Sequence, residues 1–184
     1  MKKAVSIISA VVIFFLCSCA RQELQNIHAF ISSLKQNSDI SDIEDDSLFA
    51  SEEDEEIRYA FRVNDDYLLG IYADKSTQKL KSCCVTFVYS SDKFTEKDNT
   101  EFFNICKGVV RSYENISADS AENLLKEMKI HQIDKIDSFH RKKDFYYYSF
   151  FKNKLGFSFT VESTRLNEED STDKKLTEKI TLEQ

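Results

Sequence analysis

Three short runs of alternating apolar and polar residues, joined by short polar turns, constrain the fold of this chain more than any other feature. In the first run, residues 57–63, every second side chain is apolar, which is the period of a half-buried strand. Similar runs follow at residues 67–73 and 79–90, the last with an apolar face of Cys83, Val85, Phe87 and Tyr89. The connections at residues 64–66 and 74–77 are too short for the crossover that parallel strands need. We therefore predict a three-stranded antiparallel meander.

The spacing of apolar residues then changes to that of helices. A stripe across residues 99–114 consists of Phe102, Phe103, Cys106, Val109, Val110 and Tyr113. A second helix is predicted to begin near Ser117 or Asp119, since Asp119 with Glu122 three residues later resembles a capping box. Its buried face would contain Ala121, Leu124, Leu125 and Met128. Upstream, residues 21–37 predict an amphipathic helix with Leu24, Ile27, Ile31 and Leu34 on one face.

A second strand pair closes the pattern at residues 145–151 and 155–163, where Leu155, Phe157, Phe159 and Val161 alternate with polar residues. The order α-βββ-αα-ββ predicts an α+β domain at residues 57–165. Its antiparallel sheet, a three-stranded meander plus a hairpin, would pack against two or three helices. Residues 166–184 are polar and charged, and we expect them to form a tail.

An acidic run separates the first helix from the meander. Residues 38–56 carry ten acidic side chains and no basic one, which predicts an extended, solvated loop. Calcium binding is the alternative, but the run lacks the alternating Asp/Asn pattern and the turn glycine of an EF-hand loop. We therefore treat residues 19–56 as an anchor segment, a helix and an acidic linker.

The N-terminus has the features of a signal peptide. Lys2 and Lys3 precede an uncharged apolar run that ends in Leu16-Cys17-Ser18-Cys19. This ending resembles a bacterial lipobox, in which an aliphatic residue at −3 and a small residue at −1 precede the lipidated cysteine. Cys19 fits that register, whereas Cys17 would place bulky Leu16 at −1. An ordinary secretory signal or an uncleaved anchor is the alternative.

The lipobox resemblance implies a location. Residues 1–18 would be removed as the signal peptide, and Cys19 would carry a diacylglycerol and further acyl chains such as palmitate. Two or three such chains hold a protein on a membrane, so the membrane is its first expected partner. The protein would face outside the cytoplasm, on the cell membrane or, because Ala20 and no aspartate follows the cysteine, on an outer membrane.

The globular part resembles the small α+β domain of uncharacterised lipoproteins from low-GC Gram-positive bacteria, over about residues 22–165. The helix after the lipobox, the meander YAFRVNDDYLLGIYADKSTQKLKSCCVTF, the helical SAENLLKEMKI and the hairpin FYYYSFFKNKLGFSFTVES carry the resemblance. The chain departs from it in having only three glycines, and acids where such domains often have a polar linker. The resemblance implies a fold and a location, and no activity.

Charge and cysteine count limit the partners and cofactors. The net charge is −7, and removal of residues 1–18 would leave 23 basic against 32 acidic residues, so no nucleic acid is expected as a partner. Cys83, Cys84 and Cys106 then remain, as small core residues or with Cys106 bridged to one of the adjacent pair. No CxxC spacing occurs and the three histidines are scattered, so we expect neither a metal site nor a cofactor.

Catalytic motifs are missing from the sequence. It contains no GxSxG, no HExxH and no glycine-rich phosphate loop. A small envelope hydrolase or thiol enzyme would have to use Cys106 or Cys84 with a histidine, such as His131 or His140. Cys106 lies on an apolar helical stripe, where a thiol stays protonated and inert. We therefore expect a non-enzymatic binding or accessory protein of the cell envelope.

The aromatic residues 145–151 give the one candidate binding surface. Alternate residues of a strand face opposite sides, so Tyr146, Tyr148 and Phe150 point away from Phe145, Tyr147 and Phe151. If helices cover one face of the sheet, one aromatic row is exposed and can bind another envelope protein. We predict the row of Tyr146, Tyr148 and Phe150 as that face; the alternative is that a helix or the tail covers it.

Overall fold

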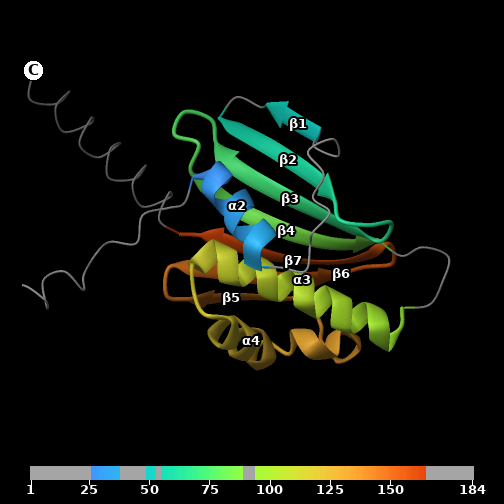
Figure 1. The fold of residues 1–184 in the computed structure, drawn as a ribbon. Coiled ribbons are helices and arrows are strands. Elements are labelled where there is room, and N and C mark those ends of the chain that lie inside the picture. Colours follow the sequence, from blue (N-terminus) through green and yellow to red (C-terminus); the bar gives the residue numbers. More distant parts are fainter. Residues whose placement is uncertain (1–25, 38–48, 53–54, 89–93, 165–184) are drawn as a thin grey trace, which may run out of the picture.

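The computed structural model describes residues 26–37, 49–52, 55–88 and 94–164 (Figure 1). The elements in chain order are α2 Ile27–Asn37, β1 Phe49–Glu52, β2 Glu56–Arg62, β3 Tyr67–Asp74, β4 Leu80–Val88, α3 Glu96–Glu114, α4 Ala118–Glu127, the 3-10 helix η2 Ile130–Lys135, β5 Phe139–Lys143, β6 Tyr146–Lys152 and β7 Gly156–Ser163. The predictions for Cys19, Tyr89, most of the acidic run and the tail lie outside the described residues.

The strands form one seven-stranded sheet in the order β1-β2-β3-β4-β7-β6-β5, with every neighbouring pair antiparallel. The α+β class is confirmed, and so are the meander β2-β3-β4 and the hairpin β6-β7. The two units join where β4 pairs with β7, so that Val85 lies opposite Phe159.

Two strands were not predicted, and each lies at an edge of the sheet. β1 pairs with β2 inside the segment expected to be an acidic loop, and β5 pairs with β6 where a polar connection was expected. An edge strand needs only one pairing neighbour, and β5 buries none of its five side chains completely. Its charged sequence FHRKK is typical of protected edges, which a search for alternating apolar residues overlooks.

The helices cover one face of this sheet (Figure 1). α2 and α3 pack side by side on it, and α4 and η2 pack against α3. Two hydroxyl groups tie the layers together, since Tyr67 donates to the Asp98 carbonyl oxygen at 2.8 Å and Tyr113 to that of Lys81. The core between the layers contains the inward residues of β2, β3, β4, β6 and β7 and the apolar faces of the helices.

The helix ends follow from local side chains. Thr95 and Asp98 form a capping box, so α3 begins at Glu96, before its apolar stripe. Ser117 caps α4 by accepting the Ser120 N–H at 3.1 Å, so the predicted capping box of Asp119 with Glu122 is wrong. Glu122 instead pairs with Lys126 at 2.6 Å, since the four-residue spacing places the two side chains together. The predicted buried face of α4, Ala121, Leu124, Leu125 and Met128, is confirmed.

The start of α2 is fixed to the turn between β3 and β4. The Ile27 N–H donates to the Gln78 carbonyl oxygen at 3.1 Å, and Asn26 forms an isolated β-bridge with Lys79. Ile27, Phe30 and Leu34 then enter the core completely, which fixes the helix along its length.

Candidate functional site: the uncovered face of the sheet

The aromatic row that was predicted to bind a partner is buried. Tyr148 and Phe150 are each 1% exposed, and Tyr146 is half-buried against the core. The prediction of Tyr146, Tyr148 and Phe150 as a binding face is therefore wrong. Both rows of β6 are aromatic, so the alternation gives no sign of which row the helices cover.

A hydrogen bond satisfies the buried tyrosine hydroxyl. Tyr148 donates to Oε1 of Glu114, at the C-terminal end of α3, at 2.5 Å. Burial raises the pKa of the Glu114 carboxyl to about 7, against the opposing effects of the Tyr148 hydrogen bond and the Lys143 charge. The pair therefore joins α3 to β6 inside the core, and it is the reason that a tyrosine is accommodated there.

The opposite row of β6 is the exposed one. Phe145 in the β5–β6 turn is 49% exposed, Phe151 is 56% exposed and Tyr147 is half-buried. The Tyr147 ring stacks on His140 of β5 at a centroid distance of 4.9 Å, and the Lys142 ammonium lies 5.6 Å from its centroid. This aromatic group belongs to the sheet face that the described helices leave uncovered, and we call that face the open face.

A second tyrosine lies on the open face across the sheet. The Arg58 guanidinium is 5.6 Å from the centroid of the Tyr72 ring, which lies beside Gly70. Strand pairing aligns Tyr72 with Ser82, Ser82 with Glu162 and Glu162 with Tyr147. The tyrosines are therefore three strand spacings apart, about 14 Å. Each has a cation over its ring, an arrangement typical of cation–π contacts.

A row of short side chains lies next to this aromatic row. Pairing runs from Gly70 through Cys84 and Thr160 to Ser149, and His140 ends the row at β5. The next row of the same face contains Leu68 and Phe151, which expose apolar surface. The open face thus combines tyrosine, cationic and apolar groups around a centre of small side chains.

No hydrogen bond joins a cysteine to a histidine in the described part of the chain, and the Cys84 thiol instead contacts the Thr86 hydroxyl. All three described cysteines are free thiols. Cys83 and Cys106 are buried, and burial raises the pKa of both thiols. Cys84 lies on the open face in the same row as His140, three strand spacings or about 14 Å away, which is too far for proton transfer.

His131 lies in η2, where it contacts α3. Its ring contacts Phe103 at a centroid distance of 6.4 Å, and its carbonyl oxygen accepts a hydrogen bond from Asn99. Among the described residues no group of three or more His, Cys, Asp or Glu side chains is arranged to hold a metal ion.

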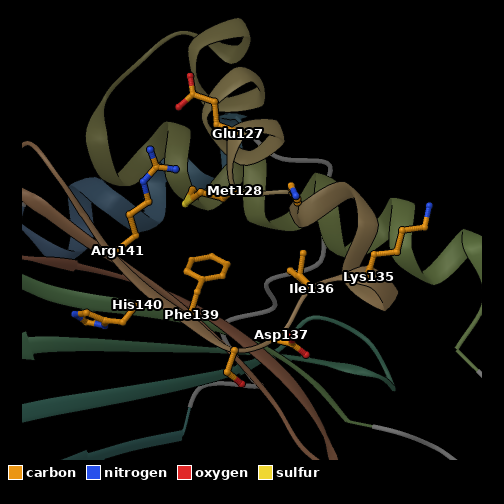
Figure 2. A pocket seen from close by; sticks show the side chains of 10 residues that line it. Glu127, Met128, Lys135, Ile136, Asp137, Phe139, His140 and Arg141 are labelled. Carbon is orange, nitrogen blue, oxygen red and sulfur yellow. The ribbon is translucent and has the colours of Figure 1, made fainter.

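A pocket of about 540 Å³ lies between α4 and β5 (Figure 2). Its walls come from the end of α4, the end of η2 and the start of β5. The pocket was not predicted, because its lining residues come from three elements and from two connections without regular spacing. The one sequence signal for the pocket is that a helix end, an irregular turn and a charged strand follow one another between residues 127 and 141.

Comparison with family models, with curated proteins and with solved structures gives no match to this chain. Within the residues that the structure describes, no helix is both long and apolar enough to cross a membrane.

Proposed function

We propose that this chain is a lipid-anchored protein of the bacterial cell envelope that binds another envelope protein through the open face of its sheet, without catalysis. The segment Leu16-Cys17-Ser18-Cys19 supports the anchor. The observation that carries the binding function is the exposure of large apolar and aromatic side chains on a sheet face that no described helix covers.

The composition of the open face suits a protein partner. Tyrosine and arginine are enriched among the interface residues whose truncation costs the most binding energy. Both bury much apolar area and also offer polar contacts. Tyr72 with Arg58 and Tyr147 with Lys142 provide this combination at two points, and Phe151 adds exposed apolar area. A partner surface with acidic groups beside apolar ones would complement it.

The anchor is tested by metabolic labelling with a palmitate analogue. The wild-type chain should be labelled, Cys19→Ala should lose the label, and Cys17→Ala should retain it. Unchanged labelling of Cys19→Ala would disprove the assignment of the lipidated residue.

The binding face is tested by cross-linking the lipidated protein in intact membranes. Tyr147→Ser with Phe151→Ser should lower recovery of the cross-linked partner at least tenfold, while urea unfolding changes by roughly 1 kcal/mol or less. Leu155→Ser is the matched control, because Leu155 is 76% exposed in the β6–β7 turn, outside the open face. Equal recovery with the double variant and the control would refute the proposed face.

A further inference from the structure

Three of the ten residues that line the pocket between α4, η2 and β5 are apolar: Met128, Ile136 and Phe139. Met128 is buried at the end of α4, and Ile136 and Phe139 pack against the core. Figure 2 shows the Phe139 ring directed towards Met128, with Ile136 on the opposite wall. The ring of Phe139 also stacks on Phe150 at a centroid distance of 6.1 Å, which fixes its position.

Arg141 brings a cation to the lining of this pocket. The side chain of Arg141 extends from β5 towards the end of α4, beside the apolar residues (Figure 2). Within the described residues its guanidinium makes no ion pair, whereas the nearby Glu127 carboxylate is paired with Lys143 at 3.5 Å. Lys129 and Lys135 add two further cations to the lining, against the two acids Glu127 and Asp137. The lining therefore has a positive balance in a chain whose net charge is −7.

The walls are held before any ligand arrives. Asn99 of α3 fixes η2 by donating to the His131 carbonyl oxygen at 2.7 Å and accepting the Ile133 N–H at 3.5 Å. The Lys152 N–H donates to the Ser138 hydroxyl at 3.2 Å, which ties the start of β5 to β6. A preformed site loses little conformational entropy on binding.

We propose that this pocket binds a small organic carboxylate with an apolar body. The carboxylate would lie on the planar guanidinium of Arg141, whose paired N–H groups match its two oxygens. The body would lie among Met128, Ile136 and Phe139. The volume of about 540 Å³ is within the range of small-molecule sites. This inference does not depend on the open face or on the lipid anchor.

The methionine content of the chain allows a direct test. The sequence contains two methionines, Met1 and Met128, so a ¹³C-methyl label on methionine places one reporter in the pocket. The full-length chain in detergent micelles would be titrated with 3-phenylpropionate, whose ring shifts a neighbouring methyl resonance. We expect a saturable shift of the Met128 signal, which is assigned by its loss in Met128→Leu.

Two comparisons separate recognition of the carboxylate from non-specific apolar binding and from non-specific attraction to positive charge. The matched amide 3-phenylpropionamide, and the variant Arg141→Gln with the acid, should each bind about tenfold more weakly, as expected for loss of a charged hydrogen bond. Lys154→Gln removes the same charge from an exposed residue of the β6–β7 turn, outside the pocket lining and the open face, and should bind the acid unchanged. Absence of a saturable shift, equal affinity for the amide, or equal weakening by Arg141→Gln and Lys154→Gln would each overturn the proposal.

Discussion

At the scale of single residues, the Glu114 carboxyl connects the stability of the fold to pH. Its pKa is about 7 in the folded chain against an ordinary value of 4.5, because burial disfavours the charge. Between these values the folded state holds more protons than the unfolded state. The free energy of unfolding therefore decreases as pH rises from 4.5 to 7.

Glu114→Gln should remove this dependence. The amide oxygen can still accept the Tyr148 hydroxyl, and no charge has to form in the core. Urea unfolding at pH 5, 6, 7 and 8 should show the wild-type chain losing roughly 2–3 kcal/mol relative to the variant over this range. Glu122→Gln is the control, since Glu122 is on the surface and the hydrogen bond and charge of Lys126 lower its pKa. Parallel pH profiles of the wild-type chain and Glu114→Gln would contradict the prediction.

Two adjacent tyrosines provide a second comparison at this scale. Tyr148→Ser removes a buried ring and leaves Glu114 without the hydroxyl, so it should cost roughly 3–5 kcal/mol of stability. Tyr147→Ser, one residue earlier on the open face, should cost roughly 1 kcal/mol or less. Urea unfolding of both variants measures the difference. Similar losses would mean that β6 does not present these two faces.

At the scale of elements, the local prediction succeeded where a segment has its own apolar period. β2, β3, β4, α3 and α4 each show such a period, and each lies within a few residues of its predicted position. β1 and β5 have none, because an edge strand is defined by the backbone of its neighbour. The choice between the two aromatic rows of β6 failed for a related reason: it depends on which face α2 and α3 cover, and that is a tertiary property. The pocket likewise arises only when three elements come together.

The start of α4 tests which residue caps the helix, Ser117 or Asp119. The structure assigns the cap to Ser117, so Ser117→Ala should cost about 1 kcal/mol of stability. Asp119→Ala removes an acid from the first turn and should cost only a few tenths of a kcal/mol, through the helix dipole. Thermal unfolding of the two variants measures both effects, and a larger loss for Asp119→Ala would favour Asp119, the other of the two predicted starts, over Ser117.

At the scale of the whole molecule, the two proposed binding surfaces are on different sides. The open face lies across the sheet from the helices, whereas the pocket lies between the helices and the β5 edge. The layers are joined by the hydroxyl bonds of Tyr67, Tyr113 and Tyr148. Because few described residues contribute to both surfaces, substitutions at Tyr147 and at Arg141 should act independently.

The attachment of Ile27 to the β3–β4 turn would set the distance between the domain and a bilayer if Cys19 carries the proposed lipid. With a lipid on Cys19, eight residue steps separate the membrane surface from this fixed point, and a fully extended chain covers at most about 29 Å over them. The domain would then search for partners in a thin layer along one leaflet, in two dimensions. Its local concentration there would be far above its average in the compartment, so even a weak contact through the open face could be occupied much of the time.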